Sequence, residues 1–518
     1  MTPIYTIAPR QSKLGAAVAA ILCAFLLVVV GASVALFGIF GAAFWLALIA
    51  AALMLVFLAF FPLTGRDLLF FAALAGLICL PIVHKVLGIA GYGFWQVFVF
   101  ASALLGLPKL LGMISRSKLL IGASICFLLF LFLVLLSTYL GRSRPAAAIY
   151  QFLSDLKPFL LLAFGLAIVW RAPAEKTFWF VVRWFWLWEL AFVVFGWVAP
   201  GVYEKVFPEP GSYWKDPSGI FPGRALGPFV HPSILASISA FFGLVCLIKS
   251  ALESEQRFKF RLLAVAYFAL VFFAVQRQEI VSFILAAAFV IVIVRPEQMR
   301  SRILLAMLLL GIGAVFLWVA FSEFILRDAT TWGFNSTGRW DNPRALLYYG
   351  GFVLAKLYFP IGAGLGTYGG AGAMKFDLSV YDELGFRQYW WFQDEQFLID
   401  TYWPNSLAES GFFGAALLLM FYCLVLLYAV IRSVKSKSRA RLYWIVFVAS
   451  TVYMLLVTFS SPAFQDTTLY FLPALMFGVA AKIEQQEGAV QAKATGRRLR
   501  PFALDGKRHG AKLLGQSY

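Results

Sequence analysis

Residues 412–430 read FFGAALLLMFYCLVLLYAV, an apolar run without a charged side chain. As a helix, such a run extends about 30 Å, which is the thickness of the hydrocarbon core of a bilayer. Similar runs recur along most of the 518 residues, of which 62% are hydrophobic and only 13% are charged. A soluble core of this size would carry far more charge. The alternating short segments of a transmembrane barrel are missing. We therefore predict an all-α, polytopic helical membrane protein.

The apolar runs predict about 12–14 transmembrane helices. The first run could be a signal peptide, but many spans follow it, so we interpret it as an uncleaved helix. The predicted helices are 14–33, 37–62, 67–84, 91–112, 119–140, 156–171, 178–199, 229–248, 262–276, 279–295, 303–322, 406–431, 442–460 and 468–482. The predicted regions are an N-terminus (1–13), helices one to eleven (14–322), a large extracytoplasmic loop (323–405), three further helices (406–482) and a basic tail (483–518).

Lysine and arginine indicate the orientation. With the N-terminus inside, the inner loops and the tail hold most of the 43 lysines and arginines, as the positive-inside rule requires. Both termini are then cytoplasmic, and the large loop faces outward. The net charge of +18 follows from this topology. The basic tail segment GRRLRPFALDGKRHGAK (496–512) is expected to lie on anionic lipid headgroups, and we expect no nucleic-acid partner.

Metal and disulfide chemistry are not expected. The five cysteines lie inside apolar runs, and the three histidines are too scattered for a usual zinc site. Gly364, Gly366 and Gly369 have GxGxxG spacing, but no strand precedes them, so a dinucleotide site is not indicated. We interpret this stretch as a turn in which the backbone approaches a substrate or another helix. No cofactor is predicted.

Basic residues on the outer side are candidates for anion binding. Arg277 lies in QRQE (276–279), between two short spans, where a charge is costly unless it faces a polar cavity or a partner. Its alternatives are a local pair with Glu279 or extension to the membrane surface. A guanidinium can form two parallel hydrogen bonds to the oxygens of a phosphate. The other candidates are Arg224, Arg339, Arg344 and His231, which is either a substrate contact or a helix-start residue.

Two carboxylates lie in DTYWPNSLAESG (400–411), directly before the apolar run. Asp400 and Glu409 are two and a half helical turns apart, so one unbroken helix would place them on opposite faces. Pro404 is expected to start the helix, leaving Asp400 in the preceding loop as a base or an orienting group. Glu409 would lie one turn into the helix and would need a partner, such as one of the arginines.

Four stretches in order carry a family resemblance. They are GRALGPFVHPSILA (223–236), QRQE (276–279), STGRWDNPRALLYYGGFVLAKLYFPIGAGLGTYG (336–369) and DTYWPNSLAESGFFG (400–414). Together they resemble the bacterial O-antigen ligase and polysaccharide (Wzy-type) polymerase superfamily of membrane glycosyltransferases. The likeness covers about residues 223 to 415. The remaining spans match only as generic hydrophobic helices.

The resemblance implies a GT-C-like fold in the bacterial inner membrane and a periplasmic active site. The donor would be an oligosaccharide on undecaprenyl pyrophosphate, and the acceptor a glycan or glycolipid. Chain-length regulator and export proteins are implied as further partners. Arg277, Arg339 and Arg224 would hold the pyrophosphate without a metal, with Arg344 nearby. Asp400 or Glu409 would orient or deprotonate the acceptor hydroxyl. Two aromatic residues, Trp390 and Trp391, would stack on sugars or anchor the loop at the interface.

One departure from the ligase pattern matters. Ligases begin the closing motif with His-Asn, whereas this chain has Asp400-Thr401. The resemblance therefore favours an exopolysaccharide or O-antigen polymerase over a ligase that transfers glycan to lipid A core. A transporter or flippase of lipid-linked glycans is the alternative of another class. The few charges within spans, Arg183 and Glu189, and the lack of an obvious internal duplication favour an enzyme.

Overall fold

The structure is a computed structural model that describes residues 69–78, 89–206, 221–229, 231–294, 342–436 and 439–494, with isolated positions between 298 and 311. Within these ranges the regular structure is entirely helical, and no strand occurs. The predicted helices 14–33 and 37–62, most of 303–322, and Arg339 lie outside the described residues.

Seven of the described helices are long and apolar enough to cross a membrane. The chain is therefore a multi-pass, all-α membrane protein, as predicted. Four more of the described helices belong to the bundle: the short apolar helix Leu69–Ile78, α9 (Arg257–Phe273), α10 (Arg277–Ile293) and α18 (Thr467–Ala494). The seven candidate spans are α3 (Ile89–Ile114, apolar from Trp95), α4 (Lys118–Leu140), α5 (Pro145–Ala167), α6 (Ala172–Val198), α8 (Pro232–Leu252), α16 (Trp403–Lys435) and α17 (Ala440–Val457).

Two predicted boundaries are wrong by more than ten residues. The helix expected over 468–482 continues to Ala494. The helix expected over 156–171 begins much earlier, at Pro145. The segment before 156 contains Gln151, Ser154 and Asp155, which read as loop residues in the sequence. All three are buried inside the bundle, where they form hydrogen bonds. Polar side chains can lie within a transmembrane helix when they are buried and hydrogen-bonded. The length of an apolar run therefore underestimates the length of the helix.

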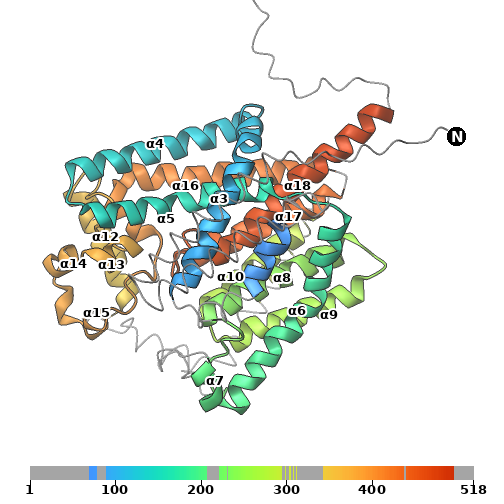
Figure 1. Cartoon of the computed structure of the whole chain (residues 1–518), viewed down its shortest axis with the longest axis horizontal. Helices are drawn as coiled ribbons and strands as arrows, with labels where there is room; N and C mark the ends of the chain where they lie inside the picture. Colours follow the sequence, from blue (N-terminus) through green and yellow to red (C-terminus); the bar gives the residue numbers. More distant parts are fainter. Residues whose placement is uncertain are drawn as a thin grey trace, which may run out of the picture.

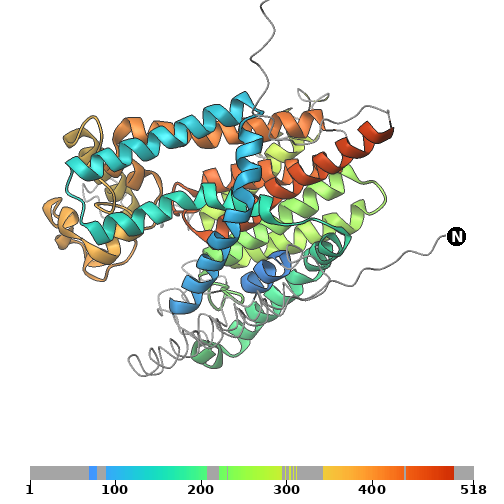
Figure 2. The ribbon, with the colours of Figure 1, turned by 45° about the horizontal axis from the view of Figure 1, so that its top comes forward.

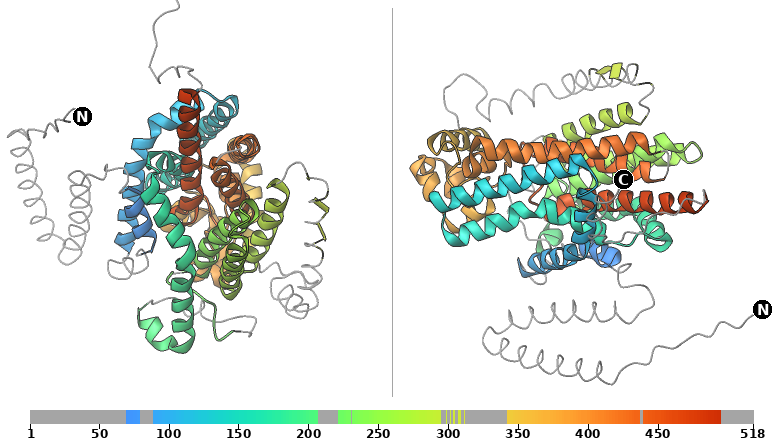
Figure 3. Two further views of the ribbon diagram at one scale, coloured as in Figure 1. Left: turned by 90° about the vertical axis from the view of Figure 1, so that its right-hand side faces the viewer. Right: turned by 90° about the horizontal axis from the view of Figure 1, so that it is seen from above.

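The spans run in layers, and a group of small helices covers one end. Figure 1 shows α4, α5 and α16 side by side, with α12 to α15 gathered at their left-hand end. The turned view in Figure 2 and the view from above in Figure 3 show the same arrangement. We call residues 342–402, which include α12 to α15, the lobe. The opposite end of the bundle, where α18 projects, we call the α18 end.

The lobe is the described part of the predicted large loop, and it has its own apolar core. Short helices surround aromatic side chains, and Tyr368 stacks on Tyr381 with ring centroids 4.6 Å apart. Leu347, Phe386 and Trp391 also belong to this core. The helices of the lobe are α12 (Pro343–Leu357), α13 (Ala371–Phe376), α14 (Ser379–Glu383), the 3₁₀-helix η2 (Phe386–Gln388) and α15 (Trp390–Gln393); α7 (Pro200–Val206) lies elsewhere, after α6.

The glycine-rich turn joins the lobe to the spans through backbone contacts. The Ala363 N–H donates to the Ala408 carbonyl oxygen at 2.8 Å, and the Gly364 N–H donates to the Glu409 carbonyl oxygen at 3.2 Å. A Cβ at Gly366 would lie 2.5 Å from the carbonyl carbon of Ala147 in α5. The interpretation as a close-approach turn is confirmed, and the elements approached are α4, α5 and α16.

Helix α16 has a break where this turn meets it. The helix begins at Trp403 with Pro404 in its first turn, so Asp400 lies in the preceding loop, as expected. Gly411 then has φ 67° and ψ −176°, a conformation that is essentially restricted to glycine. The Pro360 carbonyl oxygen lies only 2.7 Å from where a Gly411 Cβ would be. Here backbone conformation and space both require glycine.

We expect Gly411→Ala to lower the free energy of unfolding by about 1–3 kcal/mol from backbone strain, plus the cost of the clash with Pro360. The midpoint of thermal unfolding in detergent would measure this loss. Gly201→Ala is the matched control, because no atom lies within 4 Å of the added Cβ and Gly201 is helical. Equal midpoints for the two variants would contradict the conclusion that position 411 requires glycine.

Candidate functional site

The turn between α9 and α10 carries the first group of site residues. Val275 has φ 51°, which is costly for a β-branched residue, and it directly precedes Gln276 and Arg277. The Gln278 amide nitrogen then donates to the carbonyl oxygens of Leu456 and Val457, at 2.9 and 2.8 Å. These bonds attach the start of α10 to the end of α17. The strained turn and its anchor therefore fix the direction in which α10 begins.

A second group comes from the lobe. The Arg344 guanidinium donates to the Asp400 carboxylate at 3.0 Å. The side chains are 42% and 31% exposed, so the pair is open to water and to a ligand. Arg344 lies in the first turn of α12, and the Asn342 side chain caps that turn by accepting from the Arg344 N–H at 2.9 Å. The cap fixes the helix start from which Arg344 extends toward Asp400.

His231 contributes from the start of α8. Its Nδ1 accepts a hydrogen bond from the Ser233 N–H at 3.1 Å, so the ring is the N-cap of the helix. When Nδ1 accepts, the proton of the neutral ring is on Nε2. Burial, followed by the charges of Arg224 and Arg344, lowers the pKa of His231 to about 4. At neutral pH His231 is therefore an uncharged ring that can donate from Nε2.

Electrostatic interactions join these groups into one cluster. Glu279, in the first turn of α10, interacts with Arg344, Asp400 and Arg224, while His231 interacts with both arginines. We call these five residues the charge cluster. They come from four segments far apart in the sequence and meet at the lobe end of the bundle. Four of them were predicted site residues, and Arg277 begins the helix that carries the fifth.

Glu279 is the member that sequence reasoning missed. It was considered only as a local partner for Arg277, yet its side chain is 4% exposed and interacts with the cluster. The available signal was its position beside Arg277 at the start of a short span, where a buried acid requires nearby cations. With two acids, two arginines and a neutral histidine, the cluster can bind an anion and accept a proton.

Asp400 is suited to accept a proton, the second of these two roles. The Asp400 carboxyl is only partly exposed; this partial burial raises its pKa, and the charge and hydrogen bond of Arg344 oppose that rise. A carboxylate with a raised pKa is a stronger base than an ordinary aspartate. The charge cluster thus contains a basic carboxylate that is hydrogen-bonded to the guanidinium of Arg344.

Glu409 belongs to a different network. It is 1% exposed, and its Oε1 accepts from the Tyr368 N–H in the glycine-rich turn at 3.5 Å. Next to it, Asn405 donates to the Tyr368 carbonyl oxygen at 2.9 Å and accepts from Gln465 at 3.3 Å. The expectation of an arginine partner is therefore corrected: the hydrogen-bond partners of the Glu409 side chain are amides of the turn and of α16.

The two candidate tryptophans differ in exposure. Trp390 is 61% exposed and remains a predicted sugar-binding or anchoring residue. Trp391 is fully buried and stacks on Tyr389 at 5.6 Å within the lobe core. A buried ring has no free face for a sugar, so the expected stacking role of Trp391 is corrected. Its function is to pack the core of the lobe.

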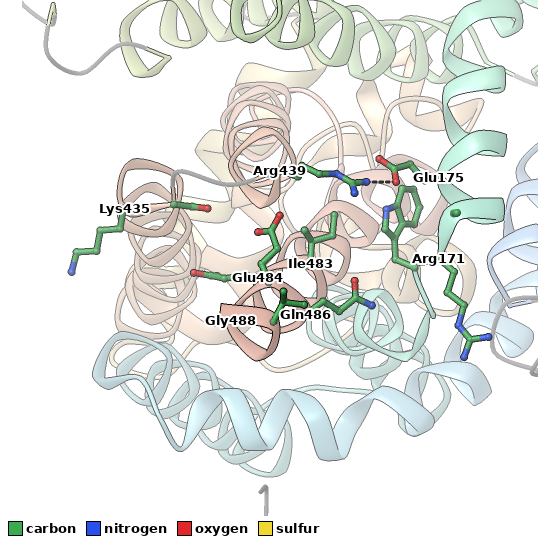
Figure 4. A pocket seen from close by; sticks show the side chains of 13 residues that line it. Arg171, Glu175, Lys435, Arg439, Ile483, Glu484, Gln486 and Gly488 are labelled. Atoms are coloured by element: carbon green, nitrogen blue, oxygen red, sulfur yellow. Dashed lines mark hydrogen bonds and ion pairs between the residues drawn. The ribbon is translucent and has the colours of Figure 1, made fainter. Parts of the chain in front are cut away.

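A cavity of about 950 Å³ lies at the α18 end (Figure 4). Arg439 is ion-paired with Glu175, which also accepts from the Tyr443 hydroxyl at 3.1 Å. Glu484 accepts from the Trp444 ring nitrogen at 3.2 Å. The acids and bases here join α6, α17 and α18 to one another. We therefore assign these contacts a packing role and place the candidate site at the lobe end.

Protonation of His231 predicts a pH-dependent contribution to stability. In the unfolded chain a histidine has a pKa of about 6.5, against about 4 here, so folding favours the neutral ring. The contribution is complete above pH 6.5 and is lost as pH falls toward 4; at pH 5 the loss is roughly 1–2 kcal/mol. His231→Asn keeps a capping side chain that does not titrate.

Thermal unfolding midpoints in detergent at pH 7.5 and pH 5 would test this expectation. The wild-type chain should lose more stability on acidification than His231→Asn, because only the imidazole takes up a proton. The same shift in both proteins would contradict the neutral state assigned to the ring.

No protein-family model and no curated protein matches this chain. The superfamily assignment accordingly remains a prediction from the four sequence stretches, and the geometry of the charge cluster has to be interpreted from its own chemistry.

Proposed function

We propose that this protein is a membrane glycosyltransferase that uses a lipid-linked sugar. The favoured form is a polymerase of an exopolysaccharide or O-antigen, with undecaprenyl pyrophosphate as the carrier of the donor glycan. The observation that carries the proposal is the charge cluster. Arg344 pairs with Asp400 at one end of a bundle of membrane spans, and Arg224 interacts there with Glu279 and His231. A substrate that is anionic, amphiphilic and membrane-bound fits that position.

The arginines supply the anion-binding part. Two guanidinium groups can share the oxygens of a diphosphate and stabilise the charge that develops as it leaves. Arg277, at the start of α10, is assigned to the same task. The Nε2–H of His231 is a further donor that adds no charge. These groups can hold and neutralise a diphosphate without a metal ion.

The carboxylate of Asp400 is the proposed proton acceptor. In the proposed step the acceptor hydroxyl oxygen forms a bond to the anomeric carbon of the donor sugar. The bond from that carbon to the diphosphate oxygen breaks, and its electron pair leaves with the diphosphate. The hydroxyl proton passes to Asp400, whose pKa is raised by burial. Glu409 is not used, because it is enclosed by the glycine-rich turn.

The proposed orientation places the lobe in the periplasm and the α18 end in the cytoplasm of a bacterial inner membrane. Its support is the distribution of basic residues, because cytoplasmic ends collect them. The cavity of Figure 4 is lined by Arg171, Lys435 and Arg439, and a neighbouring cavity between α3, α4, α16 and α18 is lined by Lys109, Arg116 and Arg432. In this orientation the cluster has no access to nucleotide sugars, which is consistent with an exported, lipid-linked donor.

Reconstitution in vesicles with a lipid-linked oligosaccharide would test the function, with products separated by size. Long glycans on the carrier would support a polymerase. A single transfer to another lipid would identify a ligase. Movement of the donor between leaflets without bond formation would identify a transporter and overturn the proposal of an enzyme.

We expect Arg277→Ala to reduce turnover by about 10²–10³-fold, the usual effect of removing one group that stabilises a leaving anion. The control is Arg387→Ala, because Arg387 lies on the lobe surface and pairs with Asp382 outside the charge cluster. Both variants should accumulate in the membrane as the wild type does. Full activity of Arg277→Ala would exclude it from diphosphate binding.

Asp400→Asn should reduce turnover by about 10²–10⁴-fold, since the amide keeps the shape but accepts no proton. In the wild type, turnover should decline as acid protonates Asp400. Because its pKa is raised, this decline should begin at a higher pH than that of an ordinary aspartate, which titrates near 3.9. A rate that is constant down to pH 4 would contradict its role as the base.

A further inference from the structure

Helix α12 is apolar on both of its faces. Leu347 and Leu354 are buried in the lobe core. On the opposite face Tyr349 is 64% exposed and Phe352 is 53% exposed. Leu357, at the end of the helix, is 71% exposed. A helix that faces water on one side normally presents polar side chains there. A contiguous exposed apolar face indicates a surface that is covered by something else.

The depth of α12 can be read from α16. That helix has 33 residues and a length of about 50 Å, well beyond the roughly 30 Å of a bilayer core. Its apolar run, 412–430, begins directly after the break at Gly411, and the residues before the break are more polar. The run alone accounts for one crossing. Phe412 and Phe413 therefore mark the boundary of the hydrocarbon at the lobe end.

Two aromatic contacts place α12 at this boundary. Phe352 meets Phe412 edge-on with centroids 5.4 Å apart, and Phe359, just after α12, lies 5.9 Å from Phe413. Phe413 is itself 56% exposed on a candidate membrane span. The exposed face of α12 is thus continuous with the lipid-facing surface of α16.

We propose that α12 is an interfacial helix whose exposed face, with Tyr349 and Phe352, lies in bilayer lipid at the lobe end. Aromatic and aliphatic side chains are typical of the lipid-facing side of such helices. Lys356, in the last turn, can reach the headgroups while its stem stays in apolar surroundings. The occupant is lipid because the surface continues that of a membrane span.

The position of α12 also bears on the substrate. The helix begins beside Arg344, and Arg344 pairs with Asp400 in the charge cluster. A lipid that lies along the exposed face would therefore have its headgroup near the guanidinium. This step rests on the proposed function: the diphosphate would bind the cluster while the isoprenoid chain stays in lipid against Phe352. The donor would enter sideways from the bilayer.

The test uses the full chain in lipid vesicles, with its native cysteines replaced by serine and one nitroxide attached at a time. The test position is Phe352→Cys. Leu419→Cys is the lipid-facing reference, because Leu419 is 44% exposed on α16. Arg387→Cys is the water-facing reference, because its side chain is 78% exposed on the lobe. Oxygen, which partitions into lipid, and a water-soluble nickel chelate serve as relaxation agents.

We expect the label at position 352 to follow that at 419, with oxygen several-fold more effective than the nickel chelate. A label that follows position 387 would show that α12 faces water and would overturn the proposal. A label protected from both agents would show a covering protein and would overturn it as well. The measurement does not depend on catalysis, so a failure of the glycosyltransferase proposal would leave its result interpretable.

Discussion

The contact between the glycine-rich turn and α16 determines the geometry of the lobe end. At Gly362 a Cβ would lie 2.5 Å from the Gly411 backbone nitrogen, so neither the turn nor α16 tolerates a side chain at this contact. This contact has two effects on the structure. It holds the lobe against the spans, and it accompanies the break in α16 that separates the segment before Gly411 from the apolar run. Arg344 and Asp400 both lie in the lobe that this contact holds in place.

Much of the fold could be predicted, because a bilayer restricts the options. The backbone within the hydrocarbon has to satisfy its own hydrogen bonds, so long apolar runs become helices. The start of α16 could be predicted from Pro404 alone, because proline is favoured in the first turn of a helix. The start of α5 was missed because Asp155 and Gln151 are polar, and only tertiary structure shows that they are buried with partners.

The site was harder to predict than the fold. Arg344 and Asp400 were each identified, but 56 residues separate them, and no local pattern shows that they form a pair. Glu279 was overlooked for the same reason: its relation to these residues exists only in the folded chain. Trp391 shows the converse error. Its sequence neighbours suggested an exposed aromatic surface, whereas the short helices of the lobe bury it completely.

Two sets of carboxylates near the lobe end differ in their partners, and this difference distinguishes their functions. Asp155 is 6% exposed and accepts from the Gln465 amide at 2.6 Å, and the Glu409 carboxylate also accepts from amides. Neutral donors that enclose an acid specify packing and leave no access for a ligand. Asp400 instead faces a guanidinium, and both side chains are partly exposed. A cation that is accessible and already paired with an acid can exchange that acid for a substrate anion, which frees the carboxylate to take a proton. This difference in exposure and partner, rather than the number of acids, is why the charge cluster is the better candidate for chemistry.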